Sequence, residues 1–352
     1  MYRCHYCYLA QREECFQGIY PQMKYTPSQV AQALSAKRLG GPCFINICAD
    51  GETLLLKNID QYVYALLNEG HYIEIVTNLT ITHMVEKILS FKKDMLKRIE
   101  FKCSFHYLEL KKRGLLDVFA QNVNRILKAG ASVTVESVPS DELIKYIDQF
   151  KRFSIENFKA LPHLTIARDD RTSNINYLTK LPLEEYDEIY SQFDSDFWKY
   201  KKSIFGVKQN KYCYAGKWSC YINLATGKAS GCYCGPDLGN VFENPNEPFP
   251  EKSIGHCPIA HCYNGHAFLT FGLIPGSTDI GYGDIRDRIC NDGSHWLQPE
   301  LKEFFNTKLV DSNKKAPAFE MASYSFRFYY NRIKNFGKRV ILFAKNRLNI
   351  GR

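Results

Sequence analysis

The segment Met1-Tyr2-Arg3-Cys4-His5-Tyr6-Cys7-Tyr8 opens the chain and contains the pattern that decides its fold. Cys4 and Cys7 form a C-x-x-C pair, and the aromatic residue Tyr6 directly precedes the second thiol. Two thiolates two residues apart can bind one iron or zinc ion, because a short turn directs both sulfurs to the same side. The pair alone is also compatible with a zinc knuckle, half of a redox dithiol, or two unrelated thiols.

The cysteine content points to metal binding in a reducing compartment. Thirteen cysteines occur in 352 residues, and seven of them fall between Cys213 and Cys290. This length allows one large domain with a smaller one. The sequence shows no signal-peptide pattern and no apolar run long enough to span a bilayer. We therefore expect a cytoplasmic protein, where clustered cysteines bind metals more often than they form disulfides.

Short apolar runs alternate with helical patterns through the first half of the chain. The strands that we expect are 43–48, 72–77, 99–103, 132–136 and 163–167, with helices following Thr26-Pro27 and over 59–67, 83–91 and 115–127. Such alternation is typical of βα units around a parallel sheet, in which ligands bind at the carboxyl ends of the strands. Polar residues close the expected strands at these ends: Asp50, Gly51, Glu52, Thr77, Asn78, Ser104 and Glu136.

Taken together, the cysteine pair and the segment Ala49-Asp50-Gly51-Glu52 resemble the radical S-adenosylmethionine (radical SAM) superfamily. The signature of that family is C-x-x-x-C-x-Φ-C, in which Φ is aromatic and three thiolates bind a [4Fe-4S] cluster. Cys4, Tyr6 and Cys7 match its last three marked positions. The first cysteine would stand directly before Met1, so we expect a chain that begins one residue too late and is inactive as written. Cys15 is a conceivable substitute, although its spacing fits no known pattern.

The resemblance implies an α/β fold, a partial (β/α)6 barrel over residues 1–200 whose first strand would precede Met1. By the same resemblance, Gly51 and Glu52 belong to a G-G-E-like motif that holds the methionine amino group. Thr77, Asn78 and Ser104 lie where the family contacts the ribose and carboxylate of S-adenosylmethionine. Thr, Asn and Ser also end strands as ordinary turn residues. Cys43, Cys48 and Cys103 lie within apolar strands, where cysteine acts as a small hydrophobe.

A second group of cysteines follows the expected barrel, over residues 210–295. Its members are Cys213, Cys220, Cys232, Cys234, Cys257 and Cys262. Residues 222–227 predict a strand that enters a hairpin turn, so we expect Cys220 and Cys232 to face each other across it. The spacing of Cys213, Gly227 and Cys232 resembles the auxiliary-cluster extension of radical SAM enzymes called SPASM, or its half-size relative called twitch.

The resemblance implies one auxiliary iron–sulfur cluster in a small α+β extension, because the later cysteine run of a full SPASM extension is absent from the sequence. The expected ligands are Cys213, Cys220 and Cys232 with Cys257 or Cys262, and Cys234 is held in reserve. Structural zinc is the alternative, since four thiolates suit either metal. His256, His261 and His266 are further possible ligands, and the role of Cys290 is left open.

The chain ends in a basic segment, 322–352. It contains eight Arg or Lys residues and no acid, which leaves +1 of the net charge of +9 for the rest of the chain. Apolar residues recur there at steps of three and four, which predicts a basic amphipathic helix broken or kinked at Gly337. Such a helix could lie on the inner membrane surface, touch nucleic acid, dock on an acidic partner or pack on its own domain. The nearly neutral body disfavours nucleic acid as a partner.

The resemblance implies an oxidoreductase-like reaction in which a reduced [4Fe-4S] cluster cleaves S-adenosylmethionine to methionine and a 5′-deoxyadenosyl radical, which abstracts hydrogen from a substrate. An electron donor such as flavodoxin or ferredoxin would supply the cluster. Many relatives with such extensions modify peptides or proteins, so a peptide is the first expected substrate. A small molecule or sugar intermediate at the membrane surface is the rival substrate. A non-catalytic iron–sulfur or zinc protein is the alternative from a different class.

Overall fold

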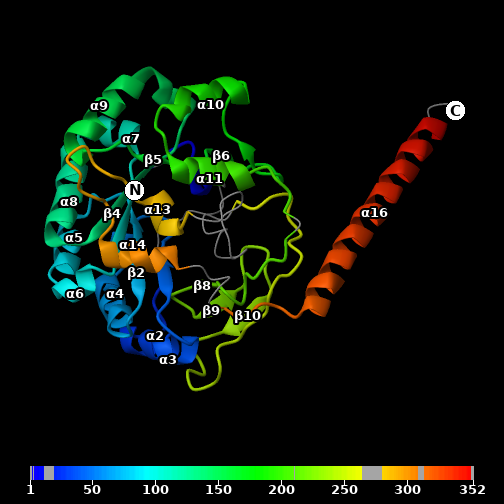
Figure 1. The fold of residues 1–352 in the computed structure, drawn as a ribbon, viewed down its shortest axis with the longest axis horizontal. Helices are drawn as coiled ribbons and strands as arrows, with labels where there is room; N and C mark the ends of the chain where they lie inside the picture. Colours follow the sequence, from blue (N-terminus) through cyan, green and yellow to red (C-terminus); the bar gives the residue numbers. More distant parts are fainter. Residues whose placement is uncertain are drawn as a thin grey trace.

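A parallel sheet organises the first half of the protein. The computed structural model describes residues 2, 4–11, 20–209, 211–263, 280–307 and 313–349. Five strands pair in chain order within this part (Figure 1). They are β1 (Phe44–Ile47), β2 (Tyr72–Thr77), β3 (Ile99–Ser104), β4 (Ser132–Ser137) and β5 (His163–Leu164). This order confirms the expected α/β architecture, a partial (β/α) barrel.

Helices connect the strands and cover the outer face of the sheet (Figure 1). Before and between the strands lie α1 (Tyr8–Gln11), α2 (Pro27–Ala33), α3 (Ala36–Leu39), η1 (Thr53–Leu55), α4 (Ile59–Asn68), α5 (Thr82–Leu89), α6 (Lys93–Leu96), α7 (Tyr107–Lys112), α8 (Leu116–Ala129), η2 (Asp141–Tyr146) and α9 (Ile147–Phe158). Helix α2 begins with a capping box, because Gln29 N donates to Thr26 Oγ1 at 3.3 Å and Thr26 N donates to Gln29 Oε1 at 2.8 Å. The expected helix start at Thr26-Pro27 is therefore confirmed.

The two faces of the sheet differ in polarity. Ile73, Phe101 and Val133 lie in the main hydrophobic core together with residues of the covering helices. Neighbouring strand residues point to opposite faces. The opposite face therefore carries Glu74 and Glu100, which are paired in register across β2 and β3. The lumen of the barrel is consequently polar and charged, while its outer wall is apolar.

The second half of the chain adds a smaller sheet and returns to the barrel. Its elements are β6 (Arg168–Asp169), β7 (Asn176–Tyr177), α10 (Leu183–Ser191), α11 (Asp196–Ile204), β8 (Tyr221–Ile222), β9 (Lys228–Ser230), β10 (Asp237–Asn240), α13 (Tyr282–Arg286), α14 (Pro299–Asn306) and α16 (Ala318–Asn349). Strands β8, β9 and β10 form an antiparallel sheet in the order β10-β9-β8. The pairing of Tyr221 with Ser230 displaces Cys232 by one residue from the position opposite Cys220, so these cysteines do not face each other directly.

Helices α13 and α14 close the barrel at the amino-terminal ends of its strands. Phe305 contacts Phe44 with ring centroids 4.8 Å apart, and Phe304 stacks on Tyr72 at 3.7 Å. Val133 N donates to the carbonyl oxygen of Trp296 at 3.0 Å. Tyr282 and Arg286 also contact the barrel, at Phe44 and Glu100, although the sequence places them with the cysteine-rich extension. The boundary of that extension stays a prediction.

The expected basic helix at the end of the chain is present as α16. It has 32 residues and stands clear of the rest of the protein over most of its length (Figure 1). The predicted break at Gly337 is wrong. One glycine costs a helix about 1 kcal/mol relative to alanine, which many flanking helical residues can offset. None of the helices in the described part of the chain combines the length and the apolar character that crossing a bilayer requires.

Candidate active site

The cysteine turn is fixed by bonds within itself and to β6. Cys7 N donates to the carbonyl oxygen of Cys4 at 2.9 Å, and Gln11 N donates to that of Cys7 at 3.0 Å, which starts α1. The side chain of Gln11 then donates to the carbonyl oxygen of Arg168 and accepts from Asp170 N, both at 2.8 Å. Cys4 is buried and Cys7 is partly exposed. The turn therefore presents two thiols from a fixed backbone, as two ligands of one cluster require.

Tyr6 links the cysteine turn to the carboxyl end of β3. Its hydroxyl lies 3.0 Å from His106 Nδ1, and the two rings are tilted with centroids 5.8 Å apart. Burial raises the pKa of Tyr6 and lowers that of His106 to about 4, so both side chains are neutral near pH 7. His106 was not predicted from the sequence as part of the site. His106 could have been identified from the sequence, because it closely follows the expected strand end at Ser104.

Glu52 joins the carboxyl ends of β1 and β2. It is 2% exposed, and its Oε1 accepts from Thr77 Oγ1 at 2.6 Å and from Leu54 N at 3.0 Å. Its Oε2 accepts from Asn78 N at 2.7 Å. Burial raises the pKa of this carboxyl, while the three donors lower it. Three of the predicted site residues, Glu52, Thr77 and Asn78, are thus brought together in one bonded group.

The remaining predicted cofactor residues lie at the same edge of the sheet. Gly51 has φ 140°, in the region that favours glycine, and this permits the turn out of β1. Ser104 ends β3 beside Glu136, its neighbour in β4. Burial raises the pKa of Tyr2, and the nearby Glu52 and Cys4 raise it further. Tyr2 therefore lies within electrostatic range of both Glu52 and the cysteine turn.

A buried charge network fills the lumen below this edge. Arg286, which ends α13 and is 0% exposed, donates to Glu100 Oε1 at 2.6 Å and to Glu74 Oε2 at 3.2 Å. It also donates to Glu136 Oε1 and, at 2.5 Å, to Thr134 Oγ1. One guanidinium thus contacts carboxylates from three adjacent strands. Burial raises the pKa of Glu100, and Arg286 opposes that shift.

Two lysines extend the network toward the carboxyl ends of the strands. Lys102 Nζ lies 3.3 Å from Glu136 Oε1, and Lys201 Nζ donates to Thr165 Oγ1 at 3.3 Å. Both amines lie over the ring of Phe197, at 5.8 and 5.0 Å from its centroid. Burial lowers the pKa of Lys201 to about 7, and the charge of Lys102 lowers it further. Two amines from different elements thus meet over one aromatic ring in this part of the lumen.

Lys102, Lys201 and Arg286 were not predicted from the sequence as residues of the lumen. A signal for them existed, because acids at the inward positions of apolar strands must pair with cations when they are buried. Such acids occur in β2, β3 and β4 at Glu74, Glu100 and Glu136. The sequence alone did not identify which cations would meet them.

In the cysteine-rich extension, three thiols converge. Cys234 Sγ lies 4.0 Å from Cys257 Sγ, and a hydrogen bond also joins Cys234 to Cys232. These bonds lower the pKa of Cys257 to about 6 and that of Cys232 to about 7, and they raise that of Cys234. Thiolate is the form of cysteine that binds metals. The arrangement thus brings the reserve residue Cys234 together with two of the expected ligands.

The other cysteines of this half of the chain have different contacts. The Cys213 backbone bonds to Gly255, with both N–H···O distances within 2.8–2.9 Å, which places Cys213 on the strand-like segment beside Cys257. Burial raises the pKa of Cys220 to about 12, and the neighbouring Cys43 adds to this shift. Cys262 packs at the edge of the second hydrophobic cluster. The Cys290 thiol donates to the carbonyl oxygen of Phe158 at 3.6 Å, a structural contact.

Within the ranges given above, no three or more His, Cys, Asp or Glu side chains are arranged as a metal-binding group. His261 is buried with its ring 4.5 Å from that of Phe205, and His256 has a pKa lowered by burial. Cys15 and His266 lie outside the described residues. The ligand sets predicted from the sequence therefore stay predictions.

The comparisons with known proteins concern the fold. No protein-family model matches the sequence, and no curated protein matches it. Among solved structures, the chain is similar to Streptococcus suis SuiB bound to S-adenosylmethionine, with a TM-score of 0.47 and 16% identity over 70% of this chain and 63% of SuiB. It is also similar to anSMEcpe with bound AdoMet and the Cp18Cys peptide, with a TM-score of 0.46 and 11% identity over 96% of this chain and 95% of that one.

The chain resembles radical SAM enzymes. This likeness is carried by the cysteine turn, by Glu52 at the end of β1 and by five parallel strands in chain order. The chain spans about 63% of the length of SuiB, so the likeness covers only part of that protein. The cysteine turn and the Glu52 group lie at the carboxyl edge of the parallel sheet, the edge at which α/β folds generally bind ligands.

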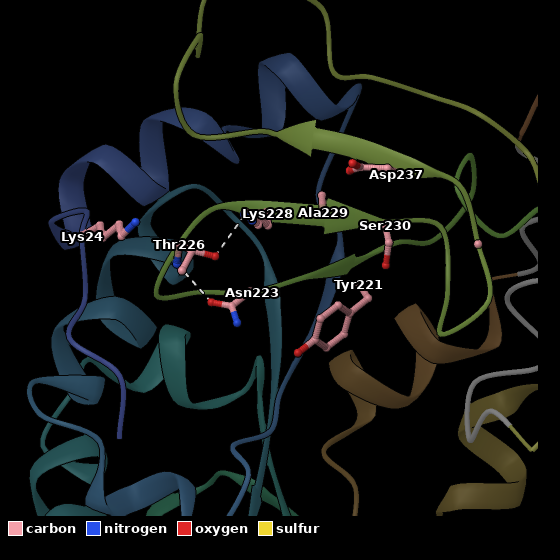
Figure 2. Close-up of a pocket in the computed structure, with 9 residues that line it drawn as sticks. Lys24, Tyr221, Asn223, Thr226, Lys228, Ala229, Ser230 and Asp237 are labelled. Atoms are coloured by element: carbon pink, nitrogen blue, oxygen red, sulfur yellow. Dashed lines mark hydrogen bonds between the residues drawn. The ribbon is translucent and has the colours of Figure 1, made fainter. Parts of the chain in front are cut away.

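A shallow pocket of about 530 Å³ lies on the hairpin of β8 and β9, outside the barrel. Figure 2 shows Asn223 and Thr226 in the hairpin turn and Tyr221 on the adjoining strand. Thr226 N donates to Asn223 Oδ1 at 3.0 Å, which closes the turn and confirms the expected hairpin. These side chains stabilise the hairpin itself, so we assign the pocket no part in the active site.

Proposed function

We propose that this chain is a radical SAM enzyme in which Cys4 and Cys7 ligate a [4Fe-4S] cluster that binds S-adenosylmethionine. When bound, this cofactor pair supplies a 5′-deoxyadenosyl radical that abstracts hydrogen from a substrate. The observation that carries the proposal is the bond from Tyr6 to His106. It fixes a C-x-x-C turn at the carboxyl edge of a parallel sheet, beside the Glu52 group. Thiols are the donor type that such a cluster requires, so the two residues fit it.

The chain's own residues would orient the cofactor and protect it. Glu52 is held rigid by three donors, and its carboxylate would pair with the amino group of S-adenosylmethionine. Lys102 and Lys201 would attract a carboxylate, either of S-adenosylmethionine or of the substrate. Two features would keep water from the lumen. One is the ring of Phe197 beneath both amines, and the other is the closure of the barrel by α13 and α14. Exclusion of water is what a reactive radical needs.

By the family resemblance, the proposed substrate is a peptide or protein, and the proposed electron donor is a flavodoxin or ferredoxin. The setting for both is the cytoplasm. Within the extension, we propose one auxiliary iron–sulfur cluster near Cys232, Cys234 and Cys257. Its support is the convergence of these thiols and the lowered pKa of two of them.

The test is anaerobic reconstitution, with iron counted and 5′-deoxyadenosine measured under a strong reductant. A chain with a cysteine added directly before Met1 completes the C-x-x-x-C spacing and is compared with the chain as given. We expect about eight irons per chain and S-adenosylmethionine cleavage in the completed chain, since two [4Fe-4S] clusters contain that number. Zinc without iron, together with no cleavage, would contradict the proposal and favour a metal-stabilised binding protein.

The auxiliary cluster is tested separately with Cys257→Ser in the completed chain. We expect a loss of about four irons per chain, with 5′-deoxyadenosine still formed, because Cys257 lies outside the cysteine turn. Cys290→Ser is the matched control, since the Cys290 thiol donates to the backbone carbonyl of Phe158 and belongs to neither proposed cluster site. An unchanged iron content in Cys257→Ser would remove Cys257 from the ligand set.

A further inference from the structure

Helix α16 exposes an unusually large apolar surface. Among the side chains of α16 that the structure describes, nine large apolar or aromatic ones are more than half exposed: Phe319, Phe326, Tyr329, Tyr330, Ile333, Phe336, Val340, Ile341 and Phe343. Exposed side chains of this size are normal singly but not as a continuous group. At 1.5 Å per residue, the 32 residues of the helix extend for about 48 Å. A long apolar surface is therefore presented outside the folded body (Figure 1).

The spacing places these side chains on one face of the helix. Phe319, Phe326, Ile333 and Val340 recur every seven residues. A second series, Tyr329, Phe336 and Phe343, is offset from the first by three residues. Positions three, four and seven residues apart lie on the same side of a helix. The stripe therefore runs along at least 24 residues.

Cations flank this apolar face. Arg332 and Arg339 border it on one side, and Lys334 and Lys338 border it on the other, as their spacing from Ile333 and Val340 requires. All four side chains are exposed. Asn331 and Asn335 occupy the opposite face. No acid follows Glu320 on this helix, so the flanking charges are all of one sign.

The first turns of α16 are anchored on the cysteine-rich extension. Tyr212 Oη donates to Glu320 Oε1 at 2.8 Å, and Tyr214 Oη donates to Met321 Sδ at 3.7 Å. The ring of Tyr324 lies 5.3 Å from that of Tyr212. The direction of the helix is thus fixed by the body at one end, and its apolar face is presented from Phe326 onward.

We propose that α16 lies on an anionic membrane surface, with its apolar face among the acyl chains and its lysines and arginines at the lipid headgroups. Large aromatic residues on one face and cations on its borders are the features of interfacial helices. A second copy of the chain fits less well, because two such faces would bring arginines together with no acids to pair with them. The charge therefore selects the anionic surface. This inference goes beyond the proposed enzyme activity and does not depend on it.

The experiment is co-sedimentation of the full chain with vesicles of phosphatidylcholine, with and without phosphatidylglycerol. We expect binding to the anionic vesicles only. Ile333→Ser with Phe336→Ser should weaken binding by at least about tenfold, because two large apolar groups no longer enter the bilayer. Lys334→Gln with Lys338→Gln should also weaken binding to anionic vesicles by about tenfold, and added salt should do the same.

The matched control is Asn331→Ser with Asn335→Ser, which changes two residues of the opposite face without changing the charge. This control should bind like the unmodified chain. Helix content is checked by circular dichroism, since all the substituted side chains point to solvent. Equal binding by the Ile333 and Phe336 variant would overturn the proposal. The proposal would also be overturned if the full chain did not bind the vesicles and instead formed a stable dimer or bound an acidic protein or nucleic acid.

Discussion

Cys7→Ser in the chain completed by a cysteine before Met1 is expected to remove about four irons per chain and to reduce 5′-deoxyadenosine to background. A serine hydroxyl does not replace thiolate as an iron ligand, and two remaining thiols hold a cluster poorly. Cys7 is the better position for this test because it is partly exposed, whereas Cys4 is buried. Iron analysis, visible absorption and product chromatography measure the effect.

Cys290→Ser serves as the control for the same chemical change. The Cys290 thiol donates to the Phe158 carbonyl, and a serine hydroxyl can keep that bond. The Cys290→Ser variant should therefore retain its iron and its cleavage of S-adenosylmethionine. Cys257→Ser gives a second comparison, because it should lose a similar amount of iron and keep cleavage. Full cleavage activity in Cys7→Ser would remove the cysteine turn from the cofactor site.

Arg286→Met is expected to lower the free energy of unfolding by about 3–5 kcal/mol, the usual cost of removing one partner from a buried ion pair. The guanidinium contacts carboxylates from β2, β3 and β4, all largely buried. Lys102 would remain as an ion-pair partner of Glu136, at 3.3 Å. Urea unfolding followed by circular dichroism measures the change.

The loss should depend on pH. Burial already raises the pKa of Glu100, and removal of Arg286 removes the charge that opposes this shift. A carboxyl with a folded-state pKa above its unfolded value of about 4.3 binds more protons when folded, so stability declines as pH rises through that interval. The variant should therefore be less destabilised near about pH 5 than near about pH 8.

Two further variants separate charge from bulk. Arg288→Met removes a nearby guanidinium that donates to the carbonyl oxygens of Asp194 and Phe193, so its cost should show little of this pH dependence. Glu100→Gln added to Arg286→Met should recover part of the stability, since it removes one unpaired charge. An Arg286→Met loss that is equal at both pH values would mean that the network is not charged as described.

Local patterns in the sequence were sufficient for the sheet. Runs such as residues 72–77 and 132–136 alternate in a way that marks strands, and their polar end residues located the carboxyl edge correctly at Glu52 and Thr77. The last strand was overestimated, because only His163–Leu164 pairs with β4 although the apolar run continues to Ala167. An apolar run shows burial, and strand pairing requires a neighbouring strand as well.

Local sequence patterns could not predict the contacts between segments that lie far apart in the chain. Arg286 meets Glu74 across 212 residues of sequence and Glu136 across 150. The hydrophobic periodicity of a sequence does not indicate which cationic residue of a later helix enters the barrel. The same holds for Cys234, whose approach to Cys257 is set by the hairpin and the following loop. The cysteine spacing suggested a metal site, and the chain path selected which thiols approach.

The sequence by itself determined the C-x-x-C spacing of Cys4 and Cys7, the alternating βα order and the basic amphipathic end of the chain. Each of these depends on residues close together in sequence, where spacing and side-chain type are enough. Tertiary structure alone decided that Tyr6 bonds to His106, that Arg286 pairs with three carboxylates in the lumen and that α16 runs unbroken away from the body. Those outcomes depend on which surfaces meet after folding, and long-range burial and charge pairing govern that choice.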